Sequence, residues 1–251
     1  MPPASGSFTG CVNYVILTAA PMDREFERMP YAVAVEFRTA SSFLVAYSVN
    51  LSRGGLFVET ATVIPEGSPV TVDLHIPGTG PASLNGVVAW CRPPDSAEGP
   101  PGLGVEFQDV APQLGGVIDL LVGTFRGVHV LLLSGHNQDR TALARSIKSI
   151  IATADVVQAQ TVATALSLMS PELDLVVIDL DFDTEGGLTT LRAAKSQVPP
   201  VPAIALMANP KLREHARRDG ADELASNPPP FAELQLALVR ALAKPSHVHD
   251  A

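Results

Sequence analysis

The chain has 251 residues, of which 46% are hydrophobic, 17% charged and 5% aromatic, and its formal net charge is -9. This composition provides enough aliphatic side chains for packed cores in two modest domains and excludes a largely disordered chain. The negative charge also excludes a general binder of nucleic acid or anionic membranes, which needs clustered Lys and Arg, but a small anionic ligand needs only a few local arginines.

The two cysteines, Cys11 and Cys91, lie far apart in the sequence and do not indicate a disulfide framework, which fits a reducing cytoplasm. No apolar run approaches the roughly 20 residues of a transmembrane helix, and the mildly apolar stretch 11–20 lacks the basic region of a signal peptide. We therefore expect a cytoplasmic protein without membrane insertion.

Residues 1–21 carry little pattern and are expected to form a loose arm. Met22 lies just before the first charged motif, and we expect translation to start there. N-terminal sequencing of the native protein checks this expectation, because residues 1–21 would then be missing.

Arg24 and Arg28 form the first motif, in which two arginines lie four positions apart. Two guanidinium groups at this spacing can close on phosphate oxygens or guanine edges, because each is a planar, permanently charged, forked donor. Asp23, Glu25 and Glu27 lie among them, so the alternative is a solvated charge cluster without a ligand.

Short segments with the composition of β-strands follow, separated by turn signals rich in Gly and Pro. Their number and spacing predict a small all-β barrel. Residues 111–122 predict one helix packed on this barrel. The predicted strands are residues 31–38, 43–50, 55–60, 69–76, 83–92 and 102–108.

The second motif begins at Asn50, continues through Ser52 and Arg53, and ends at Gly54-Gly55. It predicts a strand edge that runs into a bend, where backbone N–H groups and a small hydroxyl can approach a ligand. We expect Gly55 to permit the bend by adopting a positive φ.

These two motifs, in this order and spacing, resemble the RxxxR and (D/N)xSxxG signatures of PilZ domains, which bind the bacterial messenger cyclic di-GMP. The resemblance implies that Arg24 and Arg28 provide most of the affinity and that Asn50 and Ser52 line the guanine side of the site. Arg53 lies at a position that the family leaves variable, so it either contacts the ligand or faces water. The stretches 43–60 and 102–110 are most similar to the PilZ-type domains of gliding, predatory proteobacteria.

From residue 127 the pattern changes to alternating strands and helices, which predicts an α/β domain with a doubly wound, five-stranded parallel sheet. The expected divisions are a barrel domain over 22–124, this domain over 127–244 and a polar tail over 245–251. The predicted strands are 128–133, 155–160, 174–180, 201–207 and 222–226, and the predicted helices are 139–151, 161–169, 187–197, 210–219 and 231–243.

This second half resembles the receiver domain of two-component response regulators, most clearly at 171–180 and 220–222. The resemblance places Asp179 at the phosphoacceptor position. The positions of the magnesium-binding acidic pair, the hydroxyl and the lysine are occupied instead by Ser134, Gly135, Met207 and Asn227. Magnesium needs charged oxygen ligands and phosphoryl transfer needs electrostatic stabilisation, so we expect Asp179 to be inactive as an acceptor.

The alternation of Asp179, Asp181 and Asp183 does not predict a calcium loop, because Thr184 and Thr190 occupy the Gly and Glu positions of that pattern. No zinc cluster, P-loop, dinucleotide fingerprint or nucleophile elbow is present in the sequence. We therefore expect no metal site, no cofactor and no catalytic residues.

The sequence thus predicts a signalling protein that is not an enzyme, with a barrel that senses cyclic di-GMP and a receiver-like domain that binds a protein partner or a second copy through residues 210–243. Two alternatives stay open. In the first, both domains have become scaffolds and no cyclic di-GMP is bound. In the second, Asp179 accepts a phosphoryl group and its phosphorylation controls the signalling activity of the protein.

Overall fold

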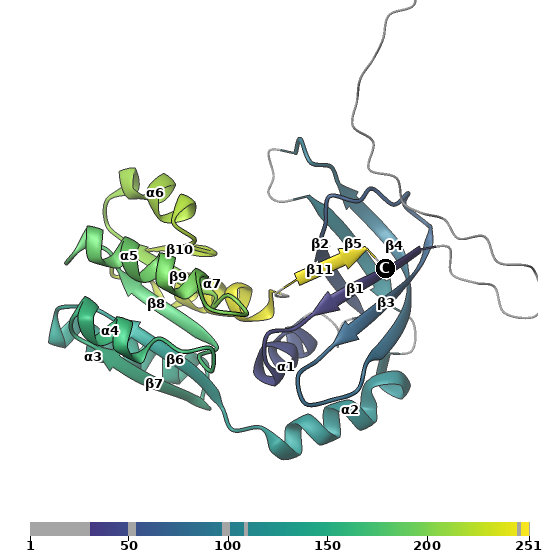
Figure 1. Cartoon of the computed structure of the whole chain (residues 1–251), viewed down its shortest axis with the longest axis horizontal. Coiled ribbons are helices and arrows are strands. Elements are labelled where there is room, and N and C mark those ends of the chain that lie inside the picture. The colour runs from purple at the N-terminus through teal and green to yellow at the C-terminus, as the bar shows by residue number, and fades with distance from the viewer. Residues whose placement is uncertain (1–30, 50–53, 97–100, 108–109, 245–246, 251) are drawn as a thin grey trace, which may run out of the picture.

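The computed structural model describes residues 31–49, 54–96, 101–107, 110–244 and 247–250. They form two domains, each built around its own β-sheet (Figure 1). The chain leaves the first domain through helix α2 (Val110–Thr124), builds the second, and returns to the first sheet with its last strand.

The first domain is a six-stranded mixed sheet curled into a half-barrel, as the sequence predicts. Two neighbouring strands are parallel and the other neighbours are antiparallel. The strand formed by residues 247–250 corrects the expectation of a tail there. In spatial order the strands are β11 (His247–Asp250), β1 (Tyr31–Glu36), β3 (Pro69–His75), β4 (Ala82–Arg92), β5 (Gly102–Phe107) and β2 (Gly55–Glu59).

Helix α1 (Ala40–Val49) replaces the strand predicted at 43–50, so that prediction is wrong. Thr39 begins the helix, because its Oγ1 accepts the Ser42 N–H at 3.0 Å while the Thr39 N–H donates to Ser42 Oγ at 3.2 Å. Phe43 packs in the barrel core, whereas Val45 packs against both domains. A helix covered on several sides has apolar residues all round, and its sequence then resembles a strand.

The second domain is a five-stranded parallel sheet with helices on both faces, as predicted. Numbered within this domain, its strand order is 5-4-3-1-2, which is the flavodoxin-like doubly wound arrangement. The strands in spatial order are β10 (Glu223–Ser226), β9 (Ala203–Met207), β8 (Leu175–Asp179), β6 (Val128–Leu133) and β7 (Ala154–Ala159).

The helices divide between two apolar layers on this sheet. Helices α3 (Asn137–Ile150) and α7 (Phe231–Ala243) pack on one face. Helices α4 (Val162–Leu168), α5 (Thr184–Lys195) and α6 (Arg213–Arg218) pack on the other, and a short 3-10 helix, η2 (Pro210–Leu212), leads into α6.

In the part of the chain that the structure describes, no helix is both long and apolar enough to span a membrane.

Gly104 on β5 tests the packing of the outer face of the half-barrel. A Cβ at this position would lie 2.1 Å from Trp90 Nε1, so Gly104→Ala should push the indole away. We expect a loss of about 1–3 kcal/mol of unfolding free energy, typical of overpacking. Trp90 is the single tryptophan, so urea unfolding followed by its fluorescence reports both the stability and the displacement.

Gly116→Ala is the matched control, because a Cβ at this exposed position of α2 meets nothing within 4 Å. It should stabilise the protein by about 0.5–1 kcal/mol through helix propensity. Equal stability of the Gly104→Ala variant and wild type would contradict the packing described here.

Candidate functional site

The first candidate site is the bend at the start of β2. Of the predicted ligand-binding residues the structure describes Gly55, the first residue of that strand. The others lie outside the described residues: Arg24, Arg28, Asn50, Ser52 and Arg53.

The left-handed residue of the bend is Gly54, with φ of 84°, and not Gly55, so the expectation of a positive φ at Gly55 is wrong. The Gly54 carbonyl accepts the Phe107 N–H at 2.6 Å, which ties the bend to β5. A Cβ on Gly55 would lie 3.3 Å from the Val105 carbonyl oxygen, which is a tight contact. The bend is therefore held closely against β5.

An aromatic pair lies on the outer face of the same strand. Residues alternate along β2, so Phe57 shares the face of Gly55, and its ring stacks on Trp90 at 5.3 Å with an interplanar angle of 11°. The Arg92 guanidinium lies over both rings, 5.1 Å and 5.3 Å from their centroids. Trp90 is 41% exposed, so this stack offers a flat, cationic surface to solvent.

Two glycines of β5 make this surface possible. A Cβ on Gly102 would lie 2.5 Å from the Phe57 ring, and a Cβ on Gly104 would collide with the Trp90 indole. Sequence reasoning gave Trp90 no role, and the signal that could have identified it is the Gly-x-Gly pattern on the neighbouring strand.

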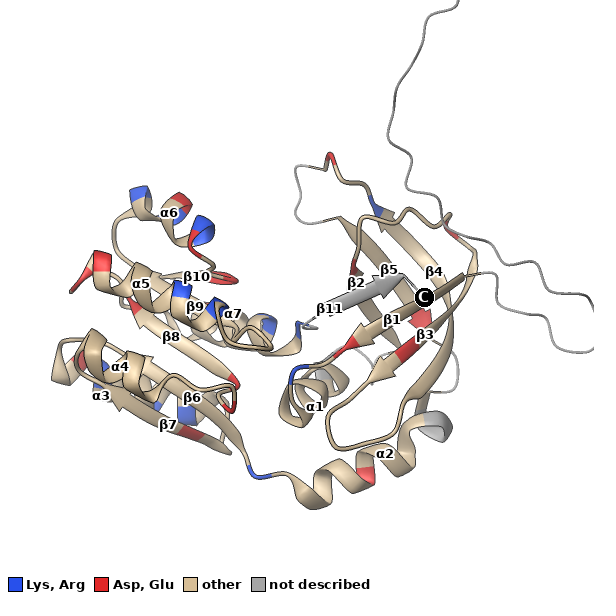
Figure 2. Ribbon diagram, viewed as in Figure 1, with Lys and Arg blue, Asp and Glu red and all other residues tan. Residues whose placement is uncertain are grey.

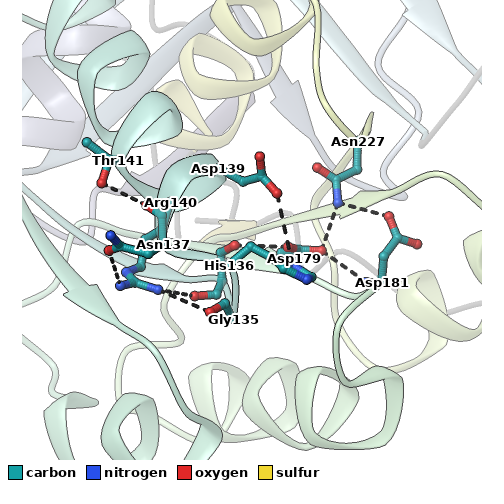
Figure 3. Close-up of polar contacts among 10 residues, drawn as sticks. Gly135, His136, Asn137, Asp139, Arg140, Thr141, Asp179, Asp181 and Asn227 are labelled. Carbon is teal, nitrogen blue, oxygen red and sulfur yellow. Dashed lines mark hydrogen bonds and ion pairs between the residues drawn. The ribbon is translucent and has the colours of Figure 1, made fainter.

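The second candidate site surrounds Asp179, at the carboxyl end of β8 and 2% exposed (Figure 3). The Ser134 hydroxyl donates to its Oδ2 at 3.0 Å, and the Asp181 N–H donates to its Oδ1 at 3.0 Å. Asn227 Nδ2 donates to the same Oδ1 at 2.8 Å. Both carboxylate oxygens are thus occupied by neutral donors of the chain itself.

Asn227 also bridges to Asp181, whose Oδ2 it reaches at 2.9 Å. That oxygen accepts the Ala208 N–H at 2.8 Å as well. Asn227 and Asp181 together therefore tie the segments that follow β8, β9 and β10. The Asn227 amide lies between two carboxylates, at the position where the sequence resemblance expects a lysine. Asp181 was not among the predicted site residues.

A buried arginine donates hydrogen bonds to the main-chain oxygens of the segment that follows β6. Arg140, 8% exposed, donates to the main-chain oxygens of Ser134 at 2.8 Å and Gly135 at 3.4 Å, and to Asn137 Oδ1 at 2.9 Å. The main-chain oxygens of Ser134 and Gly135 are thus bound by a cationic side chain of the same domain. Asp183 instead caps α5 by accepting the Gly186 N–H, which explains its place in the acidic alternation.

The pKa of Asp179 lies above its ordinary value, chiefly because burial disfavours the charged form. The hydrogen bonds from the Asp181 backbone and the Ser134 hydroxyl act in the opposite direction, while the charge of Asp181 raises the pKa further. Within the described residues, no group of three or more His, Cys, Asp or Glu side chains could hold a metal ion.

The segment predicted to bind a partner, residues 210–243, carries basic and acidic side chains (Figure 2) as well as exposed apolar ones. Arg217 is exposed and donates to the Asp222 carbonyl at 2.7 Å, and Arg218 lies 3.8 Å from Asp219. Phe231 and Leu236 of α7 are 53% and 50% exposed. The basic and apolar residues thus lie on one continuous stretch of the chain.

Residues 22–123 match the family model of the PilZ domain. Solved structures similar to the second domain include the signal receiver domain of a DNA-binding response regulator from Colwellia psychrerythraea, with 16% identity and a TM-score of 0.42. Another is the receiver domain of a sensor histidine kinase from Pseudomonas aeruginosa, with 23% identity and a TM-score of 0.41. Each match covers 47% of this chain and 99% of the solved chain. Comparison with curated proteins gives no match.

Asn227→Ala tests the network around Asp179. Removal of the amide leaves two carboxylates facing each other, and we expect a loss of about 1–3 kcal/mol of unfolding free energy at neutral pH. The variant should also raise the pKa of Asp179 further. A raised pKa means that the folded state binds a proton more readily than the unfolded state, so stability increases as the pH falls. The loss should therefore shrink on acidification towards the ordinary carboxyl range.

Urea unfolding of this variant at neutral and mildly acidic pH measures both effects, with Asn85→Ala on the exposed side of β4 as the control. A loss of stability that does not depend on pH would contradict a role for Asn227 in stabilising the ionised form of Asp179.

Proposed function

We propose that this chain, in which a PilZ domain over residues 22–123 is joined to a domain with the receiver fold, is a signalling protein that responds to cyclic di-GMP. The observation that carries the proposal is the stacked pair of Phe57 and Trp90 beside the Gly54-Gly55 bend. A guanine ring stacks readily on exposed aromatic side chains, and a guanidinium group beside them favours an anionic nucleotide.

The two sequence motifs supply the remaining contacts in this proposal. Arg24 and Arg28 bind phosphate oxygens or guanine edges, and Asn50 and Ser52 line the guanine side. Arg53 either joins them or faces water. The second motif ends at Gly54-Gly55, where the strand that carries Phe57 begins, and this closeness in the chain supports a single site on the outer face of the half-barrel.

For the second domain we propose a role in protein interaction without phosphorylation. The occupied carboxylate of Asp179, the neutral Asn227 at the lysine position and the buried Arg140 support this role. Its partner is a protein or a second copy of the chain, bound through residues 210–243. The basic residues Arg213, Arg217 and Arg218 and the exposed Phe231 provide a surface of mixed charge and apolar area.

Calorimetric titration with cyclic di-GMP tests the first half of this proposal. Each charge-assisted contact contributes about 1.5–3 kcal/mol, so Arg28→Ala should weaken binding about ten- to a hundred-fold. Binding should also change the fluorescence of Trp90. Arg145→Ala removes the same charge from an exposed position on α3 and should leave the affinity unchanged.

The absence of heat with wild-type protein would favour the alternative in which both domains are scaffolds. The acidic neighbours of Arg24 and Arg28, namely Asp23, Glu25 and Glu27, are the sequence feature that favours that alternative.

Incubation with a small phosphodonor and Mg²⁺ tests the second half. We expect an unchanged intact mass, because neutral donors already occupy the carboxylate of Asp179 and, within the described residues, no group of three or more His, Cys, Asp or Glu side chains could hold the metal. An adduct of one phosphoryl group that disappears in Asp179→Asn would instead establish phosphorylation-driven output.

A further inference from the structure

Arg38, which follows β1 in the first domain, is buried against the second domain. It is 7% exposed and donates to main-chain oxygens of the second domain: to Pro171 at 2.6 Å, to Pro199 at 3.3 Å and to Leu173. Burial lowers the pKa of Arg38 and the charge of Asp174 raises it. The guanidinium stays charged at neutral pH, because its ordinary pKa is so high.

The next residues extend this contact. Thr39 Oγ1 donates to Asp174 Oδ1 at 2.5 Å, and the other oxygen of that carboxylate accepts the His129 N–H at 2.8 Å. Ser41 Oγ donates to the Gly127 carbonyl at 3.0 Å. These partners precede strands β6 and β8, so the first domain docks on the amino edge of the second sheet, opposite the carboxyl ends where Asp179 lies.

Helix α1 continues from this contact into the interface between the domains. It packs against α7, and Val45 contributes to the core of the second domain while Ala243 of α7 lies in the core of the first. Lys244 forms an ion pair at 3.0 Å with Glu59, at the end of β2. The last strand, β11, then pairs with β1.

We propose that Arg38 is an interdomain latch, and that docking of the two domains is thermodynamically coupled to ligand occupancy on the outer face of the half-barrel. The second part rests on the proposed function. The coupling follows from strand β2, whose Phe57 belongs to the aromatic stack and whose Glu59 pairs with Lys244 at the end of α7. A movement of α7 and the second domain relative to the half-barrel would pull on this strand.

Because the contacts of Arg38 are polar, the equilibrium between docked and undocked domains can shift. Hydrogen bonds between the domains exchange with water at modest net cost, so undocking of such a contact is reversible. Any ligand that favours one arrangement must change the docking equilibrium, and docking must change the affinity for that ligand by the same factor.

Amide hydrogen exchange and small-angle scattering of the full chain test the latch in Arg38→Ala. We expect protection of the His129 amide to fall by about ten-fold or more, because Thr39 and Asp174 lose their alignment, and the radius of gyration to increase. Arg38→Lys should give an intermediate loss, since an ammonium group cannot reach the same set of carbonyls in one plane. Arg145→Ala should behave like wild type.

A folded Arg38→Ala variant with wild-type exchange and scattering would overturn the latch, and the lysine variant decides the question if the alanine variant does not fold. Titration of the same variants with cyclic di-GMP tests the coupling, for which we expect a several-fold change in affinity in Arg38→Ala. Unchanged affinity despite undocking would refute the coupling alone. A wild-type protein that binds no cyclic di-GMP would refute the proposed function, while exchange and scattering still decide the latch.

Discussion

The arrangement of the two domains depends on a buried guanidinium group that is satisfied by main-chain oxygens of the other domain. A charge removed from water is tolerated only where hydrogen bonds replace its hydration, and Arg38 obtains these from Pro171, Leu173 and Pro199. All three lie in loops before strands of the second sheet, where carbonyl groups are left without strand partners. The planar guanidinium fits several such oxygens at once, which a lysine does not.

The amino and carboxyl edges of the second sheet differ in what they bind. The amino edge is occupied by the first domain through Arg38, Thr39 and Ser41. The carboxyl edge holds Asp179 in a set of internal hydrogen bonds. In doubly wound folds the carboxyl edge is the usual place for ligands and chemistry. Here that edge is closed by the chain's own side chains.

Much of the fold could be predicted from the sequence because most segments face one environment. The central strands of the second domain, β6, β8 and β9, are largely buried on both sides and appear as short apolar runs, and the strands of the half-barrel alternate between core and solvent. Helix α1 faces two cores at once, so the periodicity of its residues did not distinguish a helix from a strand. The strand at 247–250 depends on pairing with β1, far away in sequence, and its polar composition gave no sign of it.

Of the two candidate sites, the surroundings of Asp179 can be compared with the sequence, since Asp179, Ser134 and Asn227 all lie within the described residues. Asp179 and the neutral residues around it followed from position in a family pattern, and the structure brings Ser134 and Asn227 onto its two oxygens. Arg38, Arg140 and Asp181 were missed, because their partners are backbone groups or residues on distant loops. A buried arginine that binds carbonyl oxygens leaves no pattern of charge in the sequence.

The return of β11 to the first sheet means that the two domains are not separate modules joined by a single linker. A chain cut after α2 would lose the strand that pairs with β1, and the backbone N–H and C=O groups of that edge would be open to other chains. It would also lose Ala243 from its core and the carbonyl groups that cover Arg38. The first domain isolated by truncation of this chain would therefore differ from the intact one in both its edge and its exposed charge.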